Sequence, residues 1–250
     1  MVDPFWAIVI AVPHEAVSIL NRMSVRAQTQ FQGIKLFEGS LGKQNCILLQ
    51  TGMGPIRAEK ATRFLLDQFP ITHLFSTGYC GALQKSMKTG DAVVADSLIS
   101  NFSKEAGLFS DTALVEQAIG ILEKLKIDYF QGPLVTSSKP ILKEEEKEKL
   151  SRQTGAIAVD MESFAVVKTV AEAPKKIASL TVRFVVDALN DKFGDYGSFI
   201  DDFARVKPAG LVREIIRRPK VLLELTGFEK KAKQARSYLL KFVEQLFDLK

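Results

Sequence analysis

The chain has 250 residues, 46% of them hydrophobic and 25% charged, which is typical of a globular protein with a sizeable core. Its two cysteines and two histidines argue against a disulfide framework, a Cys/His zinc site and a His-based catalytic triad. The net charge of +5 is uneven, because residues 205–250 hold 12 Lys/Arg and 5 Asp/Glu (net +7), which leaves −2 for residues 1–204.

The first third of the chain alternates predicted strands and helices. In chain order we expect a buried strand at 5–11, a helix at 15–23, paired strands at 34–38 and 45–51, a helix at 55–69, and a strand at 72–77 that ends in a turn at 78–81. Pro55 is well placed to begin its helix, because the missing N–H of proline does no harm in the first helical turn.

The middle of the chain continues this alternation. We expect a strand at 92–99, a helix at 114–125, a strand at 129–136, a helix at 143–150, a strand at 156–159, a helix at 161–171 and a buried strand at 177–186. The helix at 143–150 is strongly charged and is expected to face solvent. Strands that alternate with helices, with extra strands between them, predict a three-layer α/β/α fold with a mixed central sheet.

The tail differs from the rest of the chain. We expect helices at 211–216, 220–225 and 229–247, separated by Pro219 and Gly227. One apolar stripe at helical spacing is expected to pack on the body of the protein; it comprises Ala235, Leu239, Phe242, Val243 and Leu246. The predicted organisation is an α/β domain over 1–204 and a basic helical extension over 205–250.

Carboxylates follow several of the predicted strands, at the sheet edge where α/β proteins bind ligands. Glu15 follows the first strand, Glu162 lies just after the strand at 156–159, and Asp187 ends the strand at 177–186. Glu162 is suited to accept hydrogen bonds from a ribose diol. Burial at a strand end would raise the pKa of Asp187, as a general acid requires. The alternatives are a polar first helical turn for Glu15 and a loop-starting residue for Asp187.

Other polar residues near this edge have plainer interpretations. Asp160 is best interpreted as a helix cap, and Gly52-Met53-Gly54 taken alone is an ordinary tight turn. Arg183 lies inside an apolar run, so it needs a carboxylate partner or a place at the sheet edge. Cys80 is more typical of a small buried residue than of a nucleophile.

Several segments together resemble the nucleoside phosphorylase and nucleosidase superfamily, with matching order and spacing over about residues 6–190. They are Ala11 to Glu15, Gly52-Met53-Gly54-Pro55-Ile56-Arg57-Ala58, Ser76-Thr77-Gly78-Tyr79-Cys80-Gly81-Ala82-Leu83, Gly90-Asp91-Ala92-Val93-Val94, Val159-Asp160-Met161-Glu162-Ser163 and Arg183-Phe184-Val185-Val186-Asp187. The nearest likeness is to the branch that hydrolyses methylthioadenosine and adenosylhomocysteine.

This resemblance implies a role for each candidate residue. Asp187 would protonate the leaving purine, and Glu15 would activate the attacking water, which parallels the two-carboxylate chemistry of glycoside hydrolysis. Glu162 would hold the ribose hydroxyls. The remaining residues expected to bind substrate are Met161, Gly78, Tyr79 and Arg183.

Two departures from the family pattern bear on the reaction and on the base. Phosphate-using members carry an arginine and a serine near the glycine-rich segment, where this chain has Ser76 and Tyr79. The lack of a cation there favours hydrolysis over phosphorolysis. The stretch 136–140 holds no aromatic residue like the one that stacks on adenine in the nucleosidases, so base specificity stays open. The tail, with Arg217-Arg218-Pro219-Lys220, resembles the hopanoid-associated branch, which acts on an adenosyl-linked lipid. The futalosine hydrolases of menaquinone synthesis are an alternative branch.

These features predict a cytoplasmic purine nucleoside hydrolase that takes a small-molecule nucleoside and needs no metal or cofactor. No nucleic-acid partner is expected, whereas a homo-oligomer is expected from the family resemblance. Two other hypotheses stay open: a phosphate-dependent phosphorylase, and a non-enzymatic, lipid-associated binding module that uses the basic tail for peripheral membrane contact.

Overall fold

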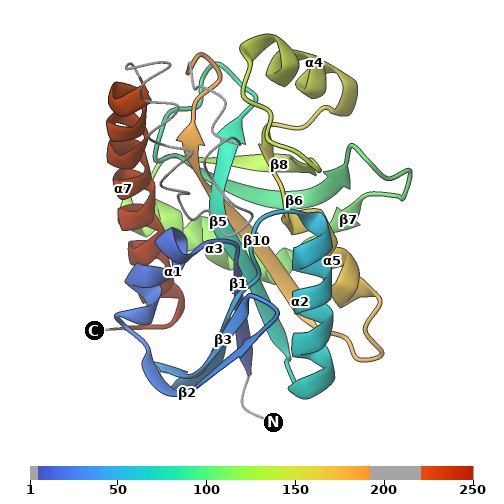
Figure 1. The fold of residues 1–250 in the computed structure, drawn as a ribbon, viewed down its shortest axis with the longest axis vertical. Helices are drawn as coiled ribbons and strands as arrows, with labels where there is room; N and C mark the ends of the chain where they lie inside the picture. Colours follow the sequence, from blue (N-terminus) through green and yellow to red (C-terminus); the bar gives the residue numbers. More distant parts are fainter. Residues whose placement is uncertain (1–4, 192–220, 250) are drawn as a thin grey trace.

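The computed structural model describes residues 5–191 and 221–249, and within them the predicted three-layer α/β/α fold with a mixed central sheet is confirmed (Figure 1). The sheet has ten strands, which in chain order are β1 (Trp6–Ile10), β2 (Ser24–Phe31), β3 (Ile34–Leu41), β4 (Gln44–Gln50), β5 (His73–Ala82), β6 (Ala92–Ser100), β7 (Leu108–Phe109), β8 (Tyr129–Thr136), β9 (Ala158–Asp160) and β10 (Ala178–Asp187).

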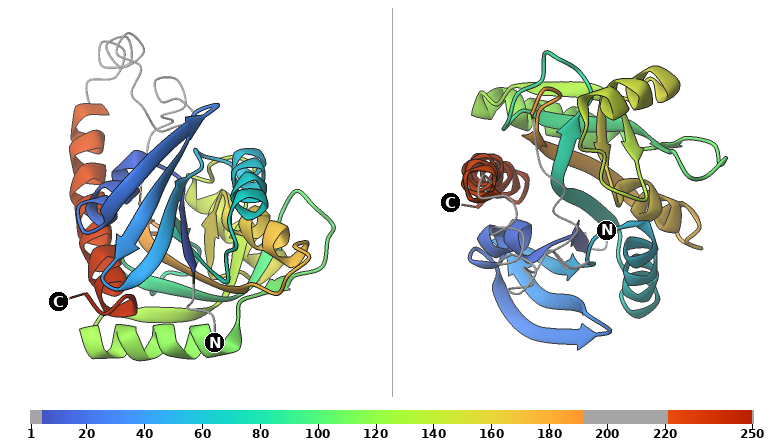
Figure 2. Two further views of the ribbon diagram at one scale, coloured as in Figure 1. Left: turned by 90° about the horizontal axis from the view of Figure 1, so that it is seen from below. Right: turned by 45° about the horizontal axis from the view of Figure 1, so that its top comes forward.

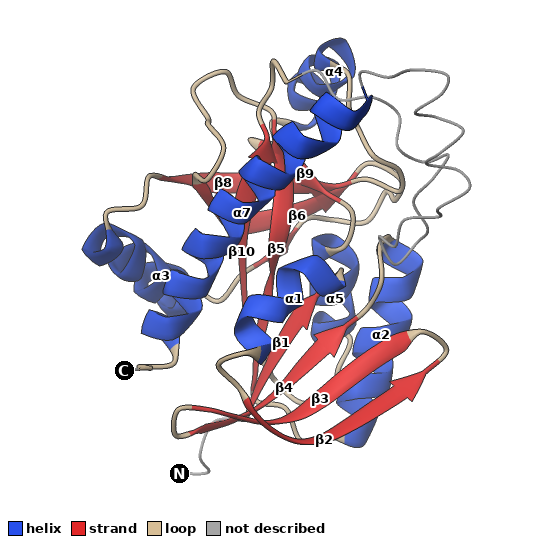
Figure 3. Ribbon diagram, turned by 60° about the vertical axis from the view of Figure 1, so that its left-hand side comes forward, coloured by secondary structure: helices blue, strands red, loops and turns tan. Residues whose placement is uncertain are grey.

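Strand pairing closes part of this sheet into a ring. β5 pairs with β10, β10 with β6, β6 with β8, β8 with β9, and β9 returns to β5. On the other side of β5, the strands β1, β4, β3 and β2 follow in order and form an open wing, which Figure 3 shows below the ring. β5 therefore lies at the junction of the ring and the wing, with a parallel neighbour on each side.

Helices cover both faces of the sheet (Figures 1 and 2). Successive side chains of β1 point to opposite faces of the sheet. Trp6, Ile8 and Ile10 pack in the core on one face, and Ala7 and Val9 pack in the core on the other, each beneath its own set of helices. The first set is α1 (Pro13–Leu20), α3 (Thr112–Leu125) and α7 (Val221–Leu246), and the second is α2 (Pro55–Gln68) and α5 (Ser163–Ala171). The remaining helix, α4 (Glu144–Thr154), lies near the end of the sheet that carries the tip of β10.

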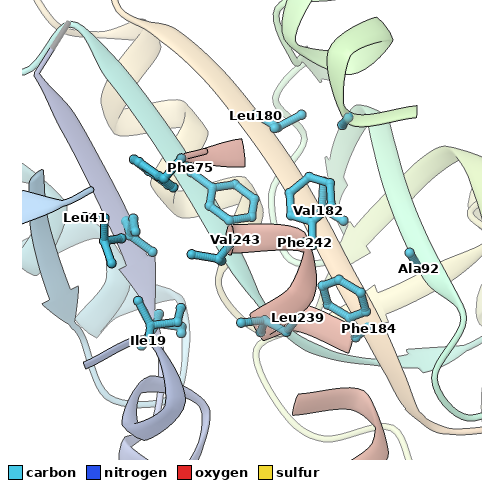
Figure 4. Close-up of a cluster of buried hydrophobic side chains, with 14 of the residues drawn as sticks. Ile19, Leu41, Phe75, Ala92, Leu180, Val182, Phe184, Leu239, Phe242 and Val243 are labelled. Carbon is cyan, nitrogen blue, oxygen red and sulfur yellow. The ribbon is translucent and has the colours of Figure 1, made fainter. Parts of the chain in front are cut away.

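The helix α7 belongs to the main hydrophobic core. Phe242 packs on Phe75 of β5 and Phe184 of β10, with ring centroids 5.6 Å and 6.3 Å away (Figure 4). The predicted stripe is buried at Ala235, Leu239, Phe242 and Val243 and partly buried at Leu246. No helix in the described parts of the chain is both long and apolar enough to cross a membrane.

The predicted break at Gly227 is wrong, because α7 is continuous through this residue. A glycine inside a helix costs only about 1 kcal/mol relative to alanine. Burial of the stripe farther along α7 more than offsets this cost, since each large apolar side chain contributes about 1.5–3 kcal/mol when fully buried. The predicted domain boundary after residue 204, the helix at 211–216 and the segment Arg217–Lys220 lie outside the described residues.

Two other predictions differ from the structure. No strand was expected at β2, although Val25, Ala27 and Phe31 alternate with polar residues. All eight residues of β2 are exposed, so the strand buries no apolar face. The segment 78–81 is a continuation of β5 and not a turn. It remains extended because it pairs with β10, where Gly78 is opposite Arg183, and its end also pairs with β9.

Candidate active site

The buried guanidinium group of Arg183 is the centre of a polar cluster between the second halves of β5 and β10 and the end of β9. Its side chain is only 2% exposed, and it forms an ion pair with Asp160 at 2.9 Å. All three of its nitrogens donate hydrogen bonds to protein oxygens: Nε to Ser163 Oγ at 3.0 Å, Nη1 to the Thr77 carbonyl at 2.8 Å, and Nη2 to the hydroxyls of Ser76 and Ser163. The carboxylate partner expected for Arg183 is thus Asp160.

Asp160 holds the start of α5 as well as Arg183. Its Oδ2 accepts hydrogen bonds from the backbone N–H of Ser163 at 3.0 Å and from the Ser163 hydroxyl at 2.5 Å. Its Oδ1 accepts from the Thr136 hydroxyl at 2.7 Å. Asp160 therefore accepts from the first turn of α5, although the N-cap position itself is Glu162. The ion pair with Arg183 is its second role. A buried carboxylate with this many donors is well satisfied.

Glu15 reaches from α1 to the middle of β5. Its Oε2 accepts hydrogen bonds from the backbone N–H groups of Ala11 and Val12, at 3.2 and 3.0 Å, and its Oε1 accepts from that of Tyr79 at 2.8 Å. Burial raises the pKa of Glu15, while Arg183 and these three amides act in the opposite direction. A carboxylate has about four acceptor positions, so Oε1 keeps one for a further donor.

Glu162 lies between β9 and α5 and joins them to the glycine segment before α2. Its Oε1 accepts a hydrogen bond from the backbone N–H of Gly54 at 2.9 Å, while its Oε2 has no hydrogen-bond partner among the described residues. Burial, followed by the negative charge of Asp160, raises the pKa of Glu162 to about 8, and Arg183 opposes this shift. The Gly52-Met53-Gly54 segment, which taken alone was interpreted as an ordinary tight turn, thus holds the carboxylate of Glu162 in position.

Gly78 allows the close approach of Arg183 and Glu15. A Cβ atom at this position would lie 2.6 Å from both Arg183 Nη1 and Glu15 Oε1, and the backbone φ of +139° is one that other residues rarely adopt. Because Gly78 has no side chain, the Arg183 guanidinium group and the Glu15 carboxylate can both lie against the backbone of β5.

We expect Gly78→Ala to lower the free energy of unfolding by about 1–3 kcal/mol and to reduce activity, because it strains the backbone and displaces two buried charged groups. Chemical denaturation and steady-state kinetics measure the two effects. Gly120→Ala in α3 is the matched control: its Cβ meets no neighbouring atom, and it should stabilise the helix by about 0.5–1 kcal/mol. A Gly78→Ala protein as stable as the unmodified chain would contradict this interpretation.

Asp187 ends β10 beside Gly81 of β5. The β5–β10 register shifts between Val185 and Asp187, and this irregularity at the strand end places Asp187 Oδ2 3.4 Å from the position of a Cβ on Gly81. Its Oδ1 accepts a hydrogen bond from Lys147 Nζ of α4 at 2.5 Å. Burial raises the pKa of Asp187 to about 6, although the charge of Lys147 acts against the rise.

The contacts of the three carboxylates place them around one stretch of β5. Glu15 accepts a hydrogen bond from the Tyr79 N–H and packs against Gly78, and Asp187 is opposite Gly81. Glu162 follows β9, which pairs with β5 at Gly81. Residues 78 and 81 are about 10 Å apart along an extended strand, which is comparable to the length of a nucleoside. The arrangement provides acceptors, a candidate acid and a candidate base at the edge of the sheet that was expected to hold the site.

The other predicted site residues have different positions. The Tyr79 side chain is directed away from Glu15, since its hydroxyl contacts His14 Nδ1 at 3.2 Å and donates to the Ala232 carbonyl of α7 at 3.3 Å. Met161 lies between Asp160 and Glu162 and is half-buried.

Cys80 is buried as expected, and its burial raises the pKa of the thiol well above the usual range. A thiol held in its neutral form is a poor nucleophile.

Comparison with known proteins identifies the family of this chain. The family model of the phosphorylase superfamily matches residues 6–217. The chain belongs to the phosphorylase superfamily. A curated member from Staphylococcus epidermidis, a 5′-methylthioadenosine/S-adenosylhomocysteine nucleosidase, is 25% identical over 213 residues, which is 78% of this chain and 92% of that protein. A nucleosidase of the same name from an Exiguobacterium species is 25% identical over 228 residues, or 84% and 97% of the two chains.

Solved structures share the phosphorylase superfamily fold over almost the whole chain. The nucleosidase from Neisseria meningitidis, solved with methylthio-immucillin-A, superposes with a TM-score of 0.78 at 20% identity and covers 98% of this chain and 99% of that one. The futalosine hydrolase of Helicobacter pylori superposes with a TM-score of 0.73 at 18% identity and covers 97% and 98%. These likenesses support the superfamily fold assigned above.

Lys147 is a residue of the candidate site that the sequence did not indicate, because its helix was expected to face solvent. Lys147 has no exposed surface, and its ammonium group binds Asp187 and the Ala188 carbonyl. The sequence does indicate that one face of this helix is buried, because Leu150 follows Lys147 by three residues and lies on the same face, which packs on the protein. In this superfamily member, one residue of the charged helix α4 thus reaches a predicted catalytic group.

Proposed function

We propose that this protein hydrolyses the N-glycosidic bond of a purine nucleoside and releases the free base, with adenine nucleosides of the methylthioadenosine and adenosylhomocysteine type as the expected substrates. Membership of the phosphorylase superfamily and the names of the similar curated proteins support the reaction class. The positions of Glu15, Glu162 and Asp187 around β5 supply the groups that such a reaction needs.

Each carboxylate has one role in the proposed reaction. Glu162 Oε2 accepts hydrogen bonds from the ribose hydroxyls. The water oxygen bonds to C1′ as the C1′–N9 bond breaks, the electron pair of that bond goes to the purine, and N7 takes the proton of Asp187. Glu15, through the free acceptor position of Oε1, takes a proton from the water. The products are the free purine and the reducing sugar, and exchange with solvent returns both carboxyl groups to their starting states.

The observation that favours water over phosphate is the way in which Arg183 is bound. Its charge is matched by Asp160, and each of its nitrogens already donates to a protein oxygen. A phosphate dianion would need such a cation with free donors. The ion pair with Asp160 also leaves no net positive charge at Arg183 to attract a phosphate dianion.

A panel of nucleosides assayed with and without phosphate tests this proposal. We expect base release from methylthioadenosine or adenosylhomocysteine without phosphate, with a reducing sugar as product and no acceleration by phosphate. Futalosine belongs in the panel because the base specificity is open. Asp187→Asn protein purified in parallel controls for contaminating nucleosidases. Release that depends on phosphate would make the protein a phosphorylase, and no release from any nucleoside would contradict both assignments.

A cytoplasmic homo-oligomer remains part of the proposal, and light scattering measures the number of subunits. Peripheral membrane contact through the tail is a separate proposal. The apolar stripe of α7 is buried, so such contact would depend on its exposed lysines, Lys230, Lys233 and Lys241. Binding to anionic vesicles that weakens as salt is added would support this contact.

A further inference from the structure

Lys147 is a buried lysine whose ammonium group faces one predicted catalytic group. Lys147 lies on the same face of α4 as Leu150 and has no exposed surface. Its Nζ donates to Asp187 Oδ1 at 2.5 Å and to the Ala188 carbonyl at 3.0 Å. A lysine side chain is costly to bury unless its charge is paired, so this placement depends on the carboxylate that it contacts.

The two oxygens of the Asp187 carboxyl group have different surroundings. Oδ1 is bound by Lys147, whereas Oδ2 has no hydrogen-bond partner among the described residues. The side chain is 12% exposed, and Oδ2 is the oxygen that Lys147 leaves available to a ligand. The contact with Lys147 therefore restrains the torsion of the carboxyl group and directs Oδ2 outward.

We propose that Lys147 is a positioning residue that aims the Asp187 carboxyl group at the leaving base and controls when that group carries a proton. This inference rests on the proposed function for its part in the reaction. The contact itself stands on the geometry of α4 and β10. No bond other than the N7–H bond already described forms in this step, because Lys147 is not a reactant in it.

Four groups act electrostatically on or around Asp187. Lys147 contacts it from α4, Asp191 lies on the loop after β10, Lys231 belongs to α7, and Cys80 is on β5. Lys231 forms an ion pair with Asp191, so these two charges largely offset each other near Asp187. The Cys80 thiol is neutral in the physiological range, because its burial raises its pKa. Lys147 is therefore the charge that most directly opposes the effect of burial on Asp187.

The chemical consequence concerns the strength of the acid. Burial alone makes Asp187 a weak acid that holds its proton tightly, and a cation at 2.5 Å stabilises the ionised form. A general acid works best when its pKa lies near the working pH. With Lys147 in place, the pKa of Asp187 is about 6, which allows the proton to pass to the purine as the glycosidic bond breaks.

The test compares Lys147→Met with Lys149→Met, which removes an exposed lysine from the same helix. The carboxyl ¹³C signal of Asp187, assigned with Asp187→Asn, is titrated in each protein without substrate. We expect the pKa of Asp187 to rise by about 1–3 units in Lys147→Met and to stay unchanged in the control. With a hydrolysed nucleoside, the alkaline limb of kcat/KM should move upward by the same amount. An unchanged titration, or an equal shift in Lys149→Met, would overturn the proposal.

A variant that does not fold is also informative. If Lys147→Met fails to fold, the double variant Lys147→Met/Asp187→Asn should recover the fold, because neither buried charge remains. Failure of the double variant as well would assign Lys147 a purely structural role and overturn the proposal. The titration requires no activity. A shifted Asp187 signal in a protein that releases no base would therefore uphold the pairing and reject only the nucleosidase assignment.

Discussion

Replacing Asp187 by asparagine should lower kcat for nucleoside hydrolysis by about 10²- to 10⁴-fold, the usual contribution of a positioned general acid. Asparagine has nearly the same shape but no proton of suitable acidity for N7. The substrate KM should change little, since the loss is confined to the transition state. Steady-state kinetics at saturating nucleoside measure the effect.

The pH dependence provides a second measure of the same group. Burial raises the pKa of Asp187 to about 6, and the acid role requires the protonated form. The rate should therefore fall as the pH rises through this value, and Asp187→Asn should abolish that limb. The control is Asp128→Asn, an exposed aspartate just before β8 that is not part of the candidate site. Full turnover in Asp187→Asn would remove this residue from the mechanism.

Replacing Arg183 by methionine should lower the free energy of unfolding by about 3–5 kcal/mol. The substitution leaves Asp160 buried without its cation, and it removes the positive charge that offsets Glu15 and Glu162. It also removes the guanidinium group that donates a hydrogen bond to the buried Thr77 carbonyl. Chemical denaturation monitored by circular dichroism measures the change.

Two controls separate the buried pair from a general effect of lost arginine. Arg63→Met removes an arginine whose contacts with Glu59 and Glu172 are exposed, and it should change stability very little. The double variant Arg183→Met/Asp160→Asn should recover part of the loss, because the buried carboxylate charge is then gone as well. Equal losses in Arg183→Met and Arg63→Met would show that the buried cluster does not stabilise the fold.

Local patterns in the sequence were sufficient for most elements of the fold. The apolar run that forms β1 and the amphipathic spacing that forms α3 reflect interactions between residues close in the chain, and both elements form where they were expected. The parallel order of β1, β5 and β10 follows from strands that alternate with helices. The same reasoning placed Glu15 and Asp187 at the correct sheet edge, because the carboxyl ends of parallel strands meet there.

Local patterns failed where tertiary packing outweighs them. Gly227 is a helix breaker by propensity, yet the burial of residues farther along α7 keeps the helix continuous. The glycine-rich segment 78–81 is typical of a turn, but pairing with β10 and β9 holds it extended. In both segments, contacts with distant parts of the chain contribute more free energy than the local preference removes.

The sequence alone determined the class of fold and the order of most of its elements, and it predicted the three carboxylates of the candidate site, since each depends on residue type and on spacing along the chain. The tertiary structure decided which groups pair: Arg183 with Asp160, and Lys147 with Asp187. These partners are 23 and 40 residues apart, and only the closure of the strand ring and the packing of α4 bring them together. The pairing matters because a buried charge takes its protonation state from its neighbours in space, which residue spacing along the chain does not specify.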